Sequence, residues 1–159
     1  MAKFAGLTGA LVLGGCLATA VLAESHVDAN AQKAIDARQA HMTLYSFNLA
    51  TLGGMAQDKI PYDAAMAETA AKNLAALGSI NQAAYWVEGT DAATVEGSKA
   101  KAEIWSNMAD FEAKEMALTE ASAALAEVAG TDLESLKAAF GAVGGACGDC
   151  HKAYRVSDN

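Results

Sequence analysis

A Cys-x-x-Cys-His motif close to the C-terminus constrains this chain more than any other feature. The motif reads Cys147-Gly148-Asp149-Cys150-His151, and only Lys152 to Asn159 follow it. It is the attachment signature of c-type haem, in which both thiols become thioethers and the histidine supplies an axial nitrogen to the iron. Every other residue of a haem pocket must then come from upstream. This position favours a helical bundle that ends at its haem.

Three other interpretations of the cysteine pair are weaker but remain open. A redox-active dithiol is expected within a βαβ unit, which this chain lacks, and it would not account for His151. A structural zinc site needs four ligands, and outside the motif only His26 and His41 could complete it. The third interpretation is a coincidental motif on a helix. The sequence therefore predicts one haem c per chain, attached through Cys147 and Cys150, with His151 as the proximal iron ligand.

Residues 1–23 have the features of a cleaved secretory signal peptide. Lys3 gives a positive start, an apolar run extends from Phe4 to Leu22, and Ala23 ends a small-residue cleavage site. Cleavage as a lipoprotein before Cys16 would leave an unusually apolar tether. We therefore expect export to the periplasm without stable membrane insertion, which suits thiol chemistry outside the cytosol. Residues 24–159 then form a single domain.

The mature chain is acidic. The full chain has a net charge of −8, and loss of the signal peptide, which contains one lysine and no acid, makes it −9. Such a charge argues against binding to nucleic acid or anionic lipid and favours redox partners with a basic docking patch. Cys16 leaves with the signal peptide, and haem attachment uses the other two cysteines. No thiol then remains for a disulfide.

Apolar residues recur at steps of three and four along the first half of the mature chain, which predicts two helices. Gly53-Gly54 lies near the end of the first helix. Pro61 suits the first turn of the second, and Gly78 closes it. The stripe of the first helix comprises Ile35, Arg38, Met42, Tyr45, Leu49 and Leu52, and that of the second comprises Ala67, Ala70, Leu74 and Leu77.

Two further helices follow a looser stretch, residues 79–97, in which Gly89-Thr90-Asp91 is the expected turn. The third helix ends at Gly130, and Thr131-Asp132-Leu133-Glu134 forms a capping box that opens the fourth. The stripe of the third helix comprises Ile104, Met108, Phe111, Leu118 and Leu125. That of the fourth comprises Leu133, Leu136, Phe140, Val143, Cys147, Cys150 and Tyr154.

The two cysteines fall in register on the apolar stripe of the fourth helix. A haem attached to them would therefore lie inside the bundle, beside Phe140 and Tyr154. The short connections favour antiparallel neighbours. The predicted fold is all-α: an antiparallel four-helix bundle with covalently bound haem c near one end.

The chain resembles the class II c-type cytochromes, the family of cytochrome c′ and cytochrome c-556. The resemblance spans the mature chain and implies the same four-helix fold. It also implies that Cys147 and Cys150 hold the haem, that His151 is the proximal ligand and that Arg155 lies near it. The matching motifs are Arg38-Gln39-x-x-Met42, Pro61-Tyr62-Asp63-Ala64, Glu103-Ile104-Trp105-Ser106 and Phe140-x-x-Val143-x-x-x-Cys147-x-x-Cys150-His151-x-x-Tyr154-Arg155.

Arg38 is a charge on an apolar stripe, which is costly unless the charge is paired. A haem propionate would suit its guanidinium group, whereas the alternative is a side chain that extends to solvent at the bundle end. The resemblance implies that Arg38 and Gln39 contact the haem. It also implies a contact between Ser98 and the haem edge, although the neighbouring Lys99 stands where relatives often have an acid. Trp105 fits a core position better than a functional one.

Met42 lies one turn beyond Arg38 on the same stripe and is the candidate sixth ligand of the iron. In cytochrome c′ an apolar residue at this place shields a five-coordinate iron, whereas in c-556 proteins a methionine binds the iron. His41 lies about 100° around the helix from Met42, away from the stripe, and is a poorer candidate.

Two functional hypotheses follow. With Met42 bound, the protein is a soluble electron carrier, because methionine ligation raises the reduction potential. Without it, the five-coordinate iron binds nitric oxide or other diatomic gases. We favour the carrier, although residues 101–114 also resemble cytochrome c′. The absence of an acid, base or nucleophile constellation around the motif argues against an enzyme. The resemblance also permits a homodimer through the first two helices, packed on Ala64, Ala67, Ala71 and Ala75.

Overall fold

The computed structural model describes Met1 and residues 28–157 of the 159-residue chain. Apart from Met1, the expected signal peptide lies outside the described residues, so cleavage after Ala23 stays a prediction. Within the described part, no helix is both long and apolar enough to cross a membrane.

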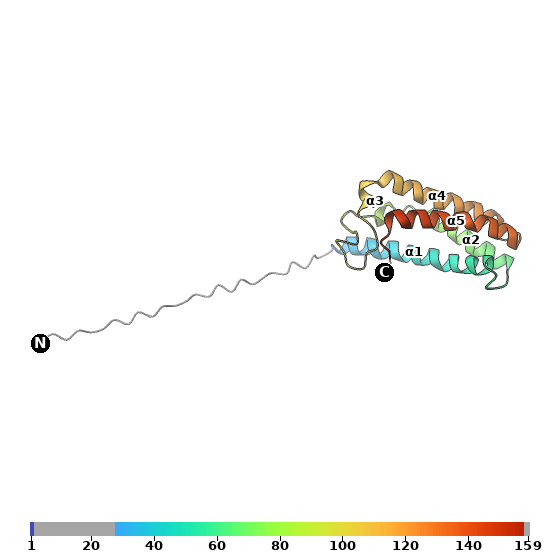
Figure 1. The fold of residues 1–159 in the computed structure, drawn as a ribbon, viewed down its shortest axis with the longest axis horizontal. Coiled ribbons are helices and arrows are strands. Elements are labelled where there is room, and N and C mark those ends of the chain that lie inside the picture. Colours follow the sequence, from blue (N-terminus) through green and yellow to red (C-terminus); the bar gives the residue numbers. More distant parts are fainter. Residues whose placement is uncertain (2–27, 158–159) are drawn as a thin grey trace.

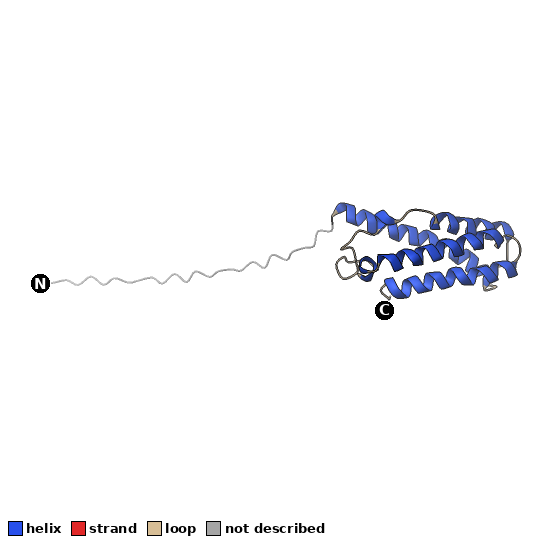
Figure 2. Ribbon diagram, turned by 90° about the horizontal axis from the view of Figure 1, so that it is seen from above, coloured by secondary structure: helices blue, strands red, loops and turns tan. Residues whose placement is uncertain are grey.

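Four long helices run antiparallel to one another along the molecule (Figure 1), which confirms the predicted all-α bundle. Two short elements lie between α2 and α4: the 3-10 helix η1 and the single-turn helix α3. Helices and loops make up the described chain (Figure 2), and its one isolated β-bridge joins Ala100 and Arg155. The bounds are α1 Ala29–Ala56, α2 Ala64–Gly78, η1 Ala83–Tyr85, α3 Glu103–Ser106, α4 Met108–Val128 and α5 Leu133–Tyr154.

The helix starts differ in detail from those predicted. Pro61 precedes α2 instead of lying in its first turn, because Asp63 is the N-cap and accepts a hydrogen bond from the Met66 amide. The capping box predicted from Thr131 is wrong by one residue. Asp132 caps α5, and its carboxylate accepts a hydrogen bond of 2.7 Å from the Ser135 amide. A carboxylate also interacts favourably with the positive end of the helix dipole.

The third predicted helix is interrupted. α3 ends at Ser106 and α4 begins at Met108, with Asn107 between them at a non-helical φ of −140°. The Asn107 side chain donates a hydrogen bond of 3.2 Å to the Tyr154 hydroxyl. The break lets Ile104 and Phe111 both join a small apolar cluster around Tyr154.

The main core lies between α2, α4 and α5, where small side chains bring the helices close together. Ala67 and Ala71 of α2 are fully buried in this core with Leu125 and Ala129. Burial of Ala67 confirms its place on the packed stripe, and neither alanine is free for the dimer packing that the resemblance permits. The helical period showed that these alanines share a face but could not show that α4 covers it.

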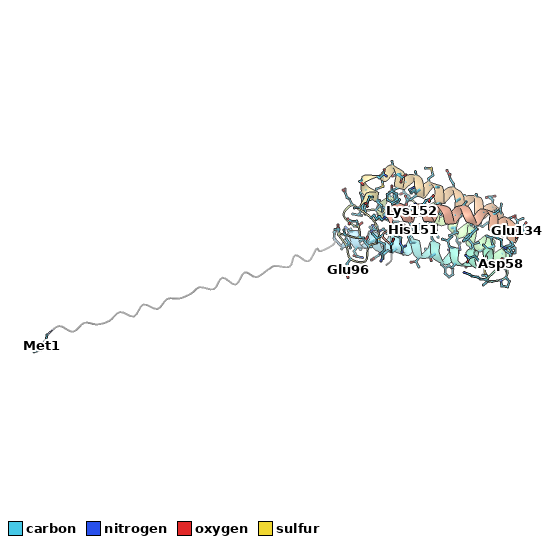
Figure 3. All side chains as sticks on the ribbon, viewed as in Figure 1. Met1, Asp58, Glu96, Glu134, His151 and Lys152 are labelled. Carbon is cyan, nitrogen blue, oxygen red and sulfur yellow. The ribbon has the colours of Figure 1, made fainter. Side chains whose placement is uncertain are left out.

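One end of the bundle is built differently from the other. α1 packs less closely against α5 than α4 does, and the connection between α2 and α4 folds over this end. Residues 99–101 pair with the end of α5: the Lys101 amide donates to the Tyr154 carbonyl at 2.9 Å, and the Val156 amide donates to the Lys99 carbonyl at 3.0 Å. Figure 3 shows His151 toward this end and Asp58 and Glu134 at the opposite end. The haem motif is therefore at the end that the connection covers.

Candidate functional site

A cavity of about 760 Å³ opens at this end between α1, α4, α5 and the connection. Cavities that hold cofactors and other organic ligands usually measure about 300–1,000 Å³, so its size suits a large organic group. Its wall is mainly apolar. The apolar wall comprises Met42, Tyr45, Leu49, Ala50, Trp86, Ala100, Ile104, Phe111, Leu118 and Tyr154.

Cys147 and Cys150 line the cavity from α5, and both are partly buried. Burial raises the pKa of the Cys147 thiol, and burial followed by the charge of Glu115 raises that of Cys150 to about 11. A redox-active dithiol needs the opposite shift, because the thiolate is the reactive form. The position of the pair in the last two turns of a helix also differs from the helix N-terminus that lowers such a pKa. These observations argue against the dithiol interpretation.

The zinc interpretation also lacks support. Among the described residues, no cluster of three or more His, Cys, Asp or Glu side chains could hold a metal ion. His41 is 5% exposed and packs against Tyr45, with ring centroids 4.9 Å apart, outside the cavity wall. The expectation that His41 points away from the packed stripe is wrong, because the 3-10 turn and the end of α2 cover this side of α1.

Phe140 also lies elsewhere than predicted. Phe140 is absent from the cavity wall and packs against Gly53 of α1, whose Cβ, if present, would lie 3.2 Å from Phe140 Cζ. The close approach of α1 and α5 at Gly53 draws the ring into the main core. Tyr154 does line the cavity, where its ring meets Phe111 edge-on at a centroid distance of 5.4 Å.

His151 lines the cavity at an exposed position on the last turn of α5. Partial desolvation, followed by the nearby charge of Arg155, lowers the pKa of His151. A lowered pKa keeps the imidazole neutral, which is the form that binds a metal. Arg155 also lines the cavity, one turn of chain beyond His151.

Met42 and Gln39 line the cavity from α1. The Met42 side chain is 37% exposed, so it lies at the open side of the wall and not in the packed core. The Gln39 amide donates a hydrogen bond of 2.9 Å to the Gly97 carbonyl. α1 and the connection are therefore joined beside Met42.

Arg38 is 4% exposed, so the alternative in which it extends to solvent is wrong. Its Nη1 donates to the Tyr85 carbonyl at 3.1 Å and to Thr90 Oγ1 at 2.8 Å. Its Nη2 donates to the Thr90 carbonyl at 2.6 Å and to Ser98 Oγ at 2.9 Å. All four acceptors are neutral oxygens of the connection, and burial lowers the pKa of Arg38.

Ser98 lies behind Arg38 instead of on the cavity wall, which includes its neighbours Gly97 and Lys99. Its hydroxyl donates to the Thr90 carbonyl at 2.7 Å while accepting the hydrogen bond from Arg38. The guanidinium also lies over the Trp86 ring, 5.1 Å from the ring centroid. Arg38 thus joins α1 to three separate points of the connection.

Several wall residues with polar groups were missed by the sequence analysis, among them Gln82, Glu115 and the indole N–H of Trp86. Gln82 Oε1 and Trp86 Nε1 are buried without a hydrogen-bond partner. Both belong to the connection, which has no periodic pattern that could have indicated them. Glu115 did carry a signal, because it lies four residues after Phe111 and three before Leu118, on the apolar stripe of its helix.

Comparisons with known proteins identify the chains that this protein is similar to. A family model described as cytochrome c′ matches residues 33–155. The chain is 41% identical over 127 residues to cytochrome c-554 of Cereibacter sphaeroides, which covers 80% of this chain and 83% of the relative. It superimposes on a solved cytochrome c′ from Rhodobacter spheriodes with a TM-score of 0.79 and 39% identity, covering 82% of this chain and 100% of that one. It also superimposes on the nitric oxide complex of a mutant cytochrome c′ from Alcaligenes xylosoxidans, with a TM-score of 0.70 and 33% identity, covering 82% and 98%.

Proposed function

Since the chain belongs to the cytochrome c′ family, whose members are haem proteins and not enzymes, we propose that it is an exported, periplasmic electron carrier with one haem c. Cys147 and Cys150 would hold the haem covalently, His151 would be the proximal ligand and Met42 the sixth ligand. The observation that carries the proposal is that Met42 and His151 line one cavity from α1 and α5. Among the described residues of this wall, they are the only thioether and the only imidazole.

The residues present fit such a cofactor. Both thiols are held in the neutral form on the cavity wall, and the wall offers an unpaired acceptor on Gln82 and an unpaired donor on Trp86. When bound, the haem supplies a one-electron redox centre. The apolar side chains of Leu49, Ile104 and Phe111, which line the cavity, would exclude water from that centre.

We also propose that Arg38 and Gln39 contact the haem from α1 and that Arg155 lies on its proximal side. Arg38 has five N–H donors, of which four serve the connection. A contact with a haem propionate would therefore be secondary to its contacts with the protein. Ser98 would act through Arg38, since its hydroxyl accepts from that side chain.

Substitution of the candidate sixth ligand tests the proposal. We expect optical spectra of the wild-type holoprotein to show a near-infrared sulfur-to-iron band when oxidised and sharp low-spin bands when reduced. Met42→Leu keeps an apolar side chain of similar volume but removes the sulfur, so it should abolish the near-infrared band and speed nitric oxide uptake. Met116→Leu, at a 61% exposed position of α4 outside the cavity wall, is the matched control and should change neither.

A second function, nitric oxide binding at a five-coordinate iron, is favoured by the likeness to a cytochrome c′ solved as a nitric oxide complex. In that case Met42 would only cover the distal side. Broad high-spin bands in wild-type protein, with ready nitric oxide uptake, would establish this function and contradict the carrier. A homodimer and a basic redox partner remain predictions under either function.

A further inference from the structure

Glu115 places a carboxyl group on the wall of an otherwise mainly apolar cavity. It is partly buried and lies on the same stripe of α4 as Phe111 and Leu118, which both line the cavity. Neither the covalent attachment nor the iron ligation proposed above uses it. The free energy needed to ionise a carboxyl group at such a position depends on the charges and hydrogen-bond donors around it.

The groups around Glu115 on α4 and the connection shift its pKa in opposite directions, and burial makes the net shift upward. Burial raises the pKa of Glu115, the nearby Trp86 indole N–H lowers it, and the charge of Glu112 raises it again. Trp86 Nε1 is buried and forms no hydrogen bond of normal length and angle. It is therefore a free donor close to the carboxyl group. Lys114, also on the wall, is paired with Asp110 at 3.7 Å.

The charge of Glu115 also reaches the other two helices of the cavity. On α1, burial followed by Glu115 raises the pKa of Tyr45 to about 12. On α5, Glu115 is the second cause, after burial, of the raised pKa of Cys150. The remaining charged or titratable groups of the wall are Arg38, Lys99, Cys147, His151, Tyr154 and Arg155. After haem attachment both thiols are thioethers. Glu115 is then the only carboxyl group among the described residues of this wall.

We propose that Glu115 is a proton-binding site coupled to the electron on the haem. It binds one proton from solvent when a one-electron donor protein reduces the haem, and it releases that proton when the electron leaves. The proposal rests on the haem binding proposed above. The physical reason is Coulombic: an added electron removes one positive charge from the cavity, which makes the ionised carboxylate less favourable there than in water.

The coupling predicts a definite dependence of the reduction potential on pH. Below the pKa of Glu115 in the oxidised protein the carboxyl is neutral in both states, and the potential does not change with pH. Between that pKa and the higher one of the reduced protein, reduction takes up a proton, so the potential falls as pH rises. Above both values the potential is again constant.

Potentiometric titration of the holoprotein across the acid and neutral range measures this slope. We expect wild-type protein to approach one proton per electron within the window, and Glu115→Gln, which is isosteric and cannot ionise, to lose that slope. Glu112→Gln removes the same charge three residues away at an exposed position outside the wall, and it should keep the slope. Infrared difference spectra of wild-type protein should show a carboxylic acid band that appears on reduction and is missing in Glu115→Gln.

A flat wild-type potential, or an equal slope in wild-type and Glu115→Gln protein, would overturn the proposal. The second result would assign the proton to a haem propionate. If Glu115→Gln does not take up haem, Glu115→Asp is measured in its place. A carboxylic acid band at the same frequency in wild-type and Glu115→Asp protein would then reject Glu115 as the proton-binding site. Absence of a haem spectrum in wild-type protein would instead reject the proposed function itself.

Discussion

Arg38 shows how a single charged residue can be accommodated inside a helical bundle without a carboxylate. Its four described hydrogen bonds go to neutral oxygens, and its guanidinium plane lies over the Trp86 ring, where a cation is attracted by the ring electrons. The residue therefore holds the connection against α1 at the cavity end. Its position on the apolar stripe follows from this structural role even before any contact with haem is considered.

Replacement of Arg38 should destabilise the protein. Arg38→Gln leaves several buried oxygens without a donor, so the free energy of unfolding should fall by about 3 kcal/mol. Urea unfolding of the holoprotein, followed by far-ultraviolet circular dichroism, measures this change. Lys33→Gln removes a positive charge at an exposed position of the same helix and should have almost no effect. Equal unfolding midpoints for the two variants would show that water replaces Arg38 in the connection.

At the level of elements, glycines differ in structural role according to what packs against them. Gly141 lies at an exposed position of α5, and an added Cβ would have no other atom within 4 Å. Gly130 lies between α4 and α5, where an added Cβ would be 2.9 Å from Glu68 Cβ and 3.3 Å from the Ala64 carbonyl oxygen. Gly130 therefore permits the close approach of α2 to the α4–α5 turn.

Alanine substitutions at these two glycines should have opposite effects. Gly141→Ala should stabilise the holoprotein by about 0.5–1 kcal/mol, because alanine loses less backbone entropy in a helix. Gly130→Ala should destabilise it by about 1–3 kcal/mol, because the backbone of α2 must move to admit a methyl group. The same urea unfolding measurement distinguishes them. Destabilisation by both variants would mean that α5 needs its glycines for a reason other than space.

The charge of the whole molecule is unevenly distributed. The chain carries a net charge of −8, yet the cavity wall contains Arg38, Lys99, Lys114 and Arg155 beside a single acid. The basic groups lie where haem propionates would need compensation. At long range the net charge dominates the field, whereas the lining of the cavity itself contains more basic than acidic side chains.

Electron transfer to a basic soluble cytochrome should therefore depend on salt. As ionic strength rises from about 10 mM to about 500 mM, we expect the second-order rate to fall about tenfold, because the attraction between opposite net charges is screened. Stopped-flow kinetics with the reduced holoprotein measure this rate. A rate that rises with salt would instead identify the basic cavity end as the surface that controls docking.

The sequence by itself was sufficient to predict the four helices, the register of Cys147 and Cys150 on α5 and the resemblance to class II cytochromes. These predictions succeed because they depend on local properties. A helical period is visible in the order of residues, and the Cys-x-x-Cys-His chemistry requires only neighbours in the chain. The bend at Asn107 was missed because it depends on Tyr154, which lies 47 residues away.

Only the tertiary structure decided which faces of the helices are covered and which groups meet in the cavity. His41 and Phe140 were misplaced because the helical period tells which residues share a face but not which neighbour packs on it. For the same reason the period did not show that α4 covers Ala67 and Ala71 of α2. The bonds of Arg38 to Thr90 and Ser98 join residues 52 and 60 positions apart. The connection that supplies these partners has no repeating pattern, so its path over the cavity depends on long-range packing and hydrogen bonds that a reading of local sequence does not contain.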